Sequence, residues 1–323
     1  MTAIGVLVMA YGGPNNLEEV PAYLQDVQGG RPTRPEIVRE VRDRYRQIGG
    51  RSPILDLTRA QADALQNALR ERATGEGWIH PFKVFVGMRH WHPYIKDTLK
   101  QMEGEGIRHA VGLVMAPHYS RMSIGAYYKK VLEAESSIDL LPVERWHLCP
   151  GYLDALHRRV QDALERFPAE VRGEVPIIFT AHSLPARIRE GSDPYQDELL
   201  ETVEELKGRL RRSPDGEGTS DVEGRCHFAF QSAAMTPDPW LGPDAGEIID
   251  KLAYEGKKEV LIAPIGFVCE HVEILYDIDI KFRQRATSRG MRLERIEMLN
   301  DAPAMIVGLA GLMVEKAREK GWL

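Results

Sequence analysis

Residues 259–277 read EVLIAPIGFVCEHVEILYD, and this stretch decides the fold of the chain. The apolar run Val260–Ala263 is typical of a short buried strand, and the residues after it carry the periodicity of a helix. Glu270, Glu273 and Asp277 in that predicted helix are spaced i, i+3 and i+7, so we expect them to share one helical face. A carboxylate stripe beside a histidine is able to hold a cation or to move protons. The alternative is an ordinary acidic first turn, which the helix dipole favours.

Short apolar runs alternate with long amphipathic stretches along the rest of the chain, as they do in a parallel sheet with crossover helices. The two halves align, with VLVMAYGGP at 6–14 against IIFTAHSLP at 177–185 and GLVMAPHYS at 112–120 against VLIAPIGFV at 260–268. Each segment is a strand followed by a loop of small, polar and proline residues. This pattern predicts an internal duplication of one α/β unit.

Six unusual side chains stand at or just after the ends of predicted strands, namely Tyr11, His90, His92, His118, His182 and Glu273. In open parallel sheets, ligands bind beyond the carboxyl ends of the strands. We therefore expect these residues to face a ligand.

Composition excludes several classes of protein. The chain has 323 residues, of which 43% are hydrophobic and 28% charged, as in ordinary soluble proteins. A net charge of −6 argues against a nucleic-acid surface. The three cysteines form no CxxC pair, which predicts reduced thiols and no iron–sulfur cluster. We find no signal peptide and no membrane span, and we expect a cytoplasmic protein.

Several other short motifs are weaker indications of a function. Gly12-Gly13 lacks the GxGxxG spacing of a nucleotide loop, and His182-Ser183 lacks the GxSxG elbow of a hydrolase. Within RHWH at 89–92, His90 and His92 would face one side of an extended segment, as metal ligands or as the wall of a cleft. The polar run 213–221 predicts a surface excursion without chemistry.

Seven segments resemble the ferrochelatase family, whose members insert ferrous iron into a porphyrin. They are VMAYGGP (8–14), DRYRQIGGRSPI (43–54), GMRHWHP (87–93), APHYS (116–120), AHSLP (181–185), TPDPWLGPD (236–244) and GFVCEHVEILYDID (266–279). They follow the order of the family and cover nearly the whole chain.

The resemblance implies an α/β fold of two Rossmann-like (chelatase-type) lobes, with parallel sheets around a central porphyrin cleft. We expect residues 1–120 to form the first lobe, completed by the C-terminal helix at 303–323, and residues 121–302 to form the second. His182 and Glu273 would be the catalytic residues that also bind the metal. Imidazole and carboxylate can each ligate Fe²⁺ or accept a pyrrole proton.

The resemblance also implies a substrate, since Tyr11 matches the coproporphyrin III type of ferrochelatase. There this tyrosine would be an axial ligand to the product iron. Positions that match the family's contacts to the propionates or the ring edge are Arg44, Tyr45, Ser52 and Tyr127. Further porphyrin or metal positions by the same resemblance are His90, Trp240, Glu270, His271 and Asp277, with His271 supporting Glu273.

The expected product is therefore Fe-coproporphyrin (coprohaem), made by a monomer with no permanently bound cofactor. Its partners would be the small-molecule porphyrin and Fe²⁺, with no nucleic acid. Alternatives are a protoporphyrin IX ferrochelatase, a cobalt or sirohaem-type chelatase, and a non-catalytic tetrapyrrole carrier.

Overall fold

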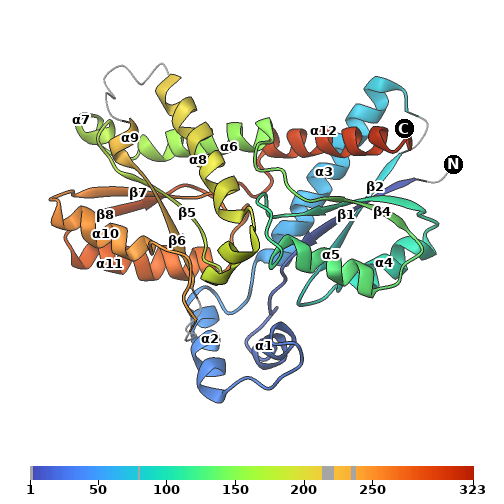
Figure 1. Ribbon diagram of the computed structural model, residues 1–323, viewed down its shortest axis with the longest axis horizontal. Helices are drawn as coiled ribbons and strands as arrows, with labels where there is room; N and C mark the ends of the chain where they lie inside the picture. Colours follow the sequence, from blue (N-terminus) through green and yellow to red (C-terminus); the bar gives the residue numbers. More distant parts are fainter. Residues whose placement is uncertain (1–2, 79–80, 213–221, 234–237) are drawn as a thin grey trace. The chain divides into compact units, whose positions relative to one another are not determined.

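The computed structural model describes residues 3–78, 81–212, 222–233 and 238–323 (Figure 1). It confirms the predicted α/β class, because it contains two parallel sheets flanked by helices. The polar run 213–221 and part of the TPDPWLGPD segment lie outside the described residues. Among the helices described, none combines the length and the hydropathy needed to cross a membrane.

The first sheet has the strand order β2-β1-β3-β4, and every pair in it is parallel. In chain order its elements are β1 (Ile4–Ala10), α1 (Val20–Val27), α2 (Pro35–Gln47), α3 (Ile54–Glu76), β2 (Phe82–Met88), α4 (Ile95–Gly104), β3 (His109–Val114), α5 (Ile124–Glu133) and β4 (Asp139–Val143). The chain moves outward from β1 to β2 and then back past β1 to β3. Right-handed crossovers therefore put α3 and α4 on opposite faces of the sheet (Figure 1).

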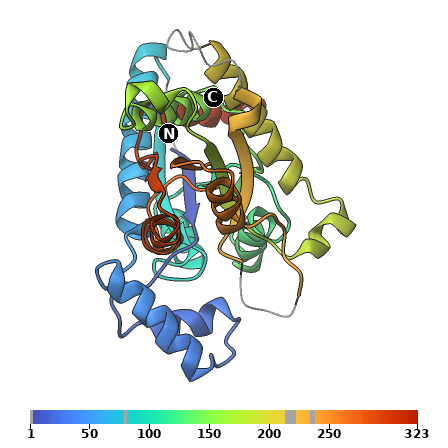
Figure 2. The same ribbon diagram turned by 90° about the vertical axis from the view of Figure 1, so that its left-hand side faces the viewer.

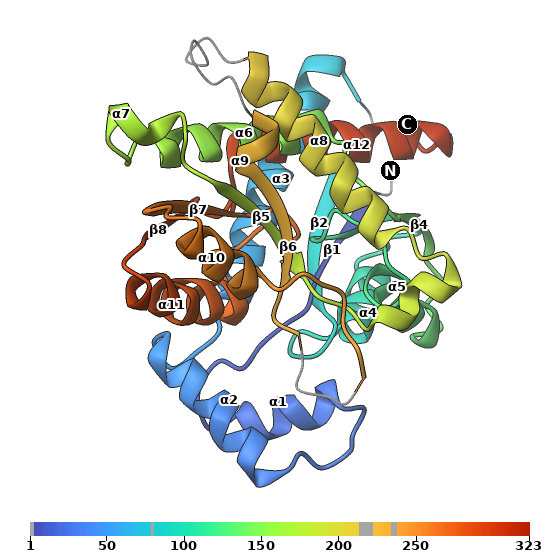
Figure 3. The same ribbon diagram turned by 60° about the vertical axis from the view of Figure 1, so that its left-hand side comes forward.

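The second sheet repeats this plan, with the order β6-β5-β7-β8. Its elements are α6 (Pro150–Leu164), α7 (Ala169–Arg172), β5 (Ile177–His182), η1 (Ala186–Gly191), α8 (Tyr195–Arg212), α9 (Val222–Arg225), β6 (Cys226–Gln231), α10 (Ala245–Tyr254), β7 (Glu259–Pro264), the π-helix η3 (Glu273–Phe282), α11 (Arg283–Ser288) and β8 (Arg292–Arg295). Figure 3 shows α8 on one face of this sheet and α10 with α11 on the other. The shared strand order agrees with the predicted duplication.

The contacts divide the chain into two compact units. The first holds residues 1–151, 269–272 and 300–323, and the second holds residues 152–268 and 273–299. The first unit thus includes α5 and β4, and the chain returns to it twice from the second. The last return forms α12 (Pro303–Glu319), which packs on α3.

A helical pair, α1 and α2, extends the first unit past the carboxyl end of β1 (Figures 1 and 2). An apolar cluster of Val20, Tyr23, Leu24, Tyr45 and Trp91 joins the pair to the loop after β2. This packing fixes the loops that follow β1 and β2, where several of the predicted site residues stand.

In the second unit, η3 is anchored by its apolar residues. Ile274, Ile278 and Phe282 are buried in one core cluster with Val260 and Ile262 of β7. Burying an isoleucine or phenylalanine side chain is worth about 1.5–3 kcal/mol, so this face holds the helix on the sheet. Each of Glu273 and Asp277 directly precedes one of these anchors in the sequence, so the anchors also fix the two carboxylates.

Candidate active site

His182 and Glu273 form the central pair of the second unit. His182 is the last residue of β5 and Glu273 is the first residue of η3. The His182 Nε2 atom lies 3.3 Å from the Glu273 Oε1 atom, and the two side chains are 31% and 30% exposed. The structure therefore brings together the two residues that the sequence analysis ranks highest, and it leaves them accessible to a ligand.

The surroundings of His182 set the tautomer of its ring. Nδ1 contacts the backbone carbonyl of Ser183, which can only accept, so Nδ1 carries the proton. In the neutral imidazole the unprotonated Nε2 then faces the Glu273 carboxylate, and both groups are acceptors. Only a proton or a metal ion between them makes this arrangement favourable. The Tyr195 hydroxyl donates to the His182 carbonyl over 3.0 Å, which further fixes the end of β5.

The charges around His182 favour its protonated form. Burial alone lowers the pKa of His182, but the Glu273 charge and hydrogen bond, the Ser183 carbonyl and the Asp277 charge outweigh it. The net effect raises the pKa of His182 above its usual value. These neighbouring groups therefore stabilise the imidazole after it has accepted a proton.

The structure corrects the predicted carboxylate stripe. The helix begins at Glu273, so Glu270 lies before it, and the prediction that Glu270 shares its face is wrong. The Glu270 N–H instead donates to the Asn300 side chain over 3.2 Å within the first unit, and this holds residue 270 outside the helix. His271 also precedes the helix, and its Nδ1 contacts the Cys269 carbonyl over 3.1 Å.

Asp277 remains on η3 and is tied to the end of β6. It is 6% exposed and accepts a hydrogen bond of 2.5 Å from the Ser232 hydroxyl. The neighbouring Gln231 side chain donates to the Glu273 carbonyl over 3.1 Å. The ring of Trp240 lies 6.4 Å from that of His182, so this predicted wall residue stands at the same end of the second sheet.

The first unit gathers Tyr11, Arg89 and His90 at the carboxyl ends of β1 and β2. Tyr11 is 38% exposed, and its ring lies 4.7 Å from the ring of His90. The Arg89 guanidinium lies 5.7 Å from the Tyr11 ring and 5.4 Å from that of Tyr127. These contacts fall within the range of cation–π attraction, so Arg89 holds both tyrosines in place.

His90 is buried and paired with a residue that the sequence analysis did not select. Its Nδ1 lies 2.9 Å from the Asp26 Oδ1 atom, and Asp26 also contacts the Tyr94 hydroxyl. Burial lowers the pKa of His90, and the Asp26 hydrogen bond only partly opposes it. The ring of His92 instead lies 4.5 Å from that of Tyr94, so the two histidines of the RHWH segment have different neighbours.

Of the four predicted porphyrin contacts, Arg44 is partly exposed and the other three are buried. Ser52 and Tyr45 lie against Gly13, where an added Cβ would stand 2.5 Å from the Ser52 Oγ and 3.5 Å from the Tyr45 hydroxyl. Arg44 is partly exposed and pairs with Glu40 over 2.6 Å. Tyr127 is buried in the core of the first unit, where burial raises the pKa of its hydroxyl.

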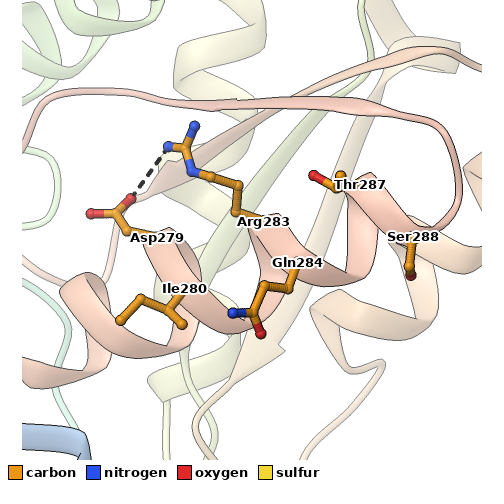
Figure 4. Close-up of a pocket in the computed structure, with 6 residues that line it drawn as sticks. All are labelled: Asp279, Ile280, Arg283, Gln284, Thr287 and Ser288. Atoms are coloured by element: carbon orange, nitrogen blue, oxygen red, sulfur yellow. Dashed lines mark ion pairs between the residues drawn. The ribbon is translucent and has the colours of Figure 1, made fainter. Parts of the chain in front are cut away.

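A hollow of about 520 Å³ lies along η3 and α11 (Figure 4). It is lined by Asp279, Ile280, Arg283, Gln284, Thr287 and Ser288. Asp279 and Arg283 form an ion pair of 3.8 Å in it. None of the predicted site residues lines it.

Sequence reasoning missed the residues that support the site. Asp26 is 64 positions from His90, and no local pattern connects the two. Ser232 and Gln231 carry a usable signal, because polar residues at the carboxyl end of a buried strand are expected to face a ligand or its supports.

Comparison with known structures bears out the fold. SirB from Bacillus subtilis, solved with Fe³⁺, superposes with a TM-score of 0.58, covering 99% of this chain and 98% of that one. At 10% identity, this likeness concerns the fold alone.

Comparison with known sequences reaches the family. The ferrochelatase family model matches residues 3–317. The ferrochelatase of Herpetosiphon aurantiacus is 42% identical, over 93% of this chain and 95% of the relative. The coproporphyrin III ferrochelatase of Oceanobacillus iheyensis is 34% identical, over 98% of each. This chain therefore belongs to the ferrochelatase family, the lyases that insert ferrous iron into a porphyrin during haem biosynthesis.

Proposed function

We propose that the porphyrin substrate is coproporphyrin III and that the product is Fe-coproporphyrin. The observation that carries this proposal is Tyr11, whose exposed ring follows β1 and is held by Arg89 and His90. A phenol oxygen in this position is suited to ligate the iron of the product. Relatives named for coproporphyrin III match nearly the whole chain, which supports the same substrate.

Carboxylate recognition supports this substrate as well. Coproporphyrin III carries more propionates than protoporphyrin IX, so it needs more polar and cationic contacts. Arg44 offers a partly exposed guanidinium, which pairs with carboxylates through two parallel hydrogen bonds. Ser52 and Tyr45 are buried beside Gly13, so Arg44 is the accessible member of these three residues.

The proposed chemistry uses His182 and Glu273 as the catalytic pair. Insertion consumes Fe²⁺ and releases two protons from the pyrrole nitrogens, so the site must bind a cation and accept protons. The neutral His182 Nε2 and the Glu273 carboxylate face each other over 3.3 Å and can do both. Because the pair offers few ligands, coordination positions stay open and the iron can pass to the macrocycle.

An anaerobic assay of the purified protein tests the substrate. With Fe²⁺ in excess, we expect a higher kcat/KM for coproporphyrin III than for protoporphyrin IX. Faster turnover of protoporphyrin IX would overturn this proposal. Preference for Co²⁺ and a sirohaem precursor in the same assay would indicate the sirohaem-type alternative.

A Tyr11→Phe variant tests the axial ligand separately. Loaded with ferric coproporphyrin, the wild-type protein should show a tyrosinate-to-iron charge-transfer band, and the variant should lack it. The insertion rate should change by less than about tenfold, which is about 1.4 kcal/mol in barrier height. An unchanged spectrum in the variant would remove Tyr11 from the iron site.

A further inference from the structure

Ser232 has an unusual backbone conformation for its place in the fold. Its φ is +60°, in the left-handed region that favours glycine. Three other described non-glycine residues have a positive φ. Ser192 directly follows η1 and Glu135 comes two residues after the end of α5, where this conformation is common. The third, Asn300, lies in the loop between β8 and α12, and asparagine is one of the residue types that adopt this conformation most readily. Ser232 instead follows a strand, β6. Such strain persists only where the surroundings determine it, and it concentrates at functional sites.

The contacts made from this turn lead to η3. The Ser232 hydroxyl donates to the buried Asp277 carboxylate over 2.5 Å, and Gln231 donates to the Glu273 carbonyl over 3.1 Å. Gln231 is itself fully buried, and its carbonyl accepts from the Ser183 N–H over 2.8 Å. Residues 231 and 232 thus connect the end of β5, which carries His182, to the first turn of η3.

η3 needs such support because of its helix type. A π-helix closes its hydrogen bonds from i to i+5, and π-helical turns are rare and frequently occur at functional sites. The apolar anchors Ile274 and Ile278 fix its distance from the sheet, but apolar contacts are not directional. The two hydrogen bonds from the end of β6 are directional, so they can fix the rotation of the first turn.

We propose that Ser232 and Gln231 are positioning residues that clamp the first turn of η3, so that Glu273 and Asp277 keep their places beside His182. This inference rests on the proposed role of His182 and Glu273. The left-handed backbone at Ser232 is the conformation in which its hydroxyl reaches Asp277. This backbone conformation lowers the stability of the folded chain, but it allows the hydroxyl to hold the two carboxylates in place.

Two variants separate placement from strain. Ser232→Ala removes the hydroxyl and keeps the strain, whereas Ser232→Gly removes both. We expect each to lower kcat by about 10- to 100-fold, as loss of a supporting contact to a metal site does. The KM for porphyrin should stay unchanged in both. The Tm of Ser232→Gly should exceed that of Ser232→Ala, because glycine adopts a positive φ without cost.

Ser192 provides the matched control. It has a φ of +51° in the same unit and is exposed. Ser192→Gly should raise the Tm relative to Ser192→Ala by a similar amount, and both variants should keep wild-type kcat.

The clamp is overturned if Ser232→Gly regains wild-type kcat, since activity would then follow strain, or if both Ser232 variants keep it. It is also overturned if the porphyrin KM rises in step with the fall in kcat. Normal rates in His182→Ala and Glu273→Gln would instead refute the underlying catalytic pair. The two failures are therefore distinguishable.

Discussion

Each unit places an imidazole–carboxylate pair at the carboxyl end of its sheet, but the two histidines face their carboxylates with different ring nitrogens. In the first unit, His90 turns Nδ1 toward Asp26 over 2.9 Å. In the second unit, His182 turns Nδ1 to a carbonyl and Nε2 toward Glu273 over 3.3 Å. A neutral His90 already satisfies its carboxylate with the Nδ1 proton. A neutral His182 cannot, because its proton is on the opposite nitrogen.

Burial and charge push the pKa values of the two histidines in opposite directions. Burial dominates at His90, whose side chain is 9% exposed, and it lowers the pKa. At His182 burial is outweighed by the Glu273 charge and hydrogen bond, the Ser183 carbonyl and the Asp277 charge, and the pKa is raised. The same pair of residue types can therefore act as a fixed support in one unit and as a site for protons or metal in the other. Two carboxylates and a backbone carbonyl favour the protonated ring at His182, whereas at His90 the charges of Arg89 and Lys130 add to the effect of burial.

The largest expected effect comes from Glu273→Gln. It removes the carboxylate that faces the His182 Nε2, so the pair loses both a metal ligand and a proton acceptor. We expect metallation to fall by about 10²- to 10⁴-fold, the usual range for a lost general base. Anaerobic initial rates measure this, and quenching of porphyrin fluorescence should show that the porphyrin still binds.

Glu270→Gln is the control for this substitution. Glu270 is close in the sequence and chemically identical, but it lies before the π-helix. Its rate should stay near wild type. Equal losses of metallation rate in the two variants would show that Glu270 also acts in the site, which would contradict its assignment outside the helix.

A smaller effect concerns the protonation of the two histidines. In the metal-free protein we expect His182 to take up its proton above pH 6.5, the reference value for histidine, and His90 to stay neutral until below it. Titration of the ring carbon resonances by NMR measures both, with His90→Gln and His182→Gln to assign them. Asp277→Asn should lower the His182 midpoint, because it removes one of the charges that raise the pKa. A His90 midpoint above that of His182 would contradict the comparison.

Much of this arrangement was predictable from the sequence, because the central strands are continuous apolar runs. β1 (Ile4–Ala10) is such a run, and all of its residues are buried. β4 and β8, which each form one of the two edges of their sheet, have no such run. β4 contains Pro142 and exposed positions, and β8 reads Arg-Leu-Glu-Arg. Proline and charge are tolerated at the edge of a sheet, so these two strands lack the continuous apolar pattern.

The site was predictable to the extent that its residues follow strands. His182 and Glu273 were identified by their places after β5 and β7 together with the family motifs. The start of η3 was not, because helical periodicity runs through Glu270, whereas its N–H is hydrogen-bonded to Asn300, 30 positions away. Asp26 was not predicted for the same reason, because its partner His90 is distant in the sequence. Long-range polar contacts leave no period in a sequence.

The smallest expected effect is the loss of stability in Asp26→Ala. This substitution leaves the His90 Nδ1–H and the Tyr94 hydroxyl without their acceptor in a largely buried place. The free energy of unfolding should fall by about 1–2 kcal/mol, within the range for breaking such a hydrogen bond. Urea denaturation measures it.

Asp43→Ala is the matched control, because Asp43 is an exposed carboxylate that forms an ion pair with Arg46 on α2. It should cost less than about 0.5 kcal/mol, as surface ion pairs do. The contrast with Glu273→Gln is the sharpest form of the comparison. Asp26→Ala should lower the free energy of unfolding while metallation stays within a few-fold of wild type. Glu273→Gln should lower the metallation rate while the free energy of unfolding stays near wild type. If Asp26→Ala instead abolished metallation in a folded protein, the first pair would belong to the chemistry and not to its support.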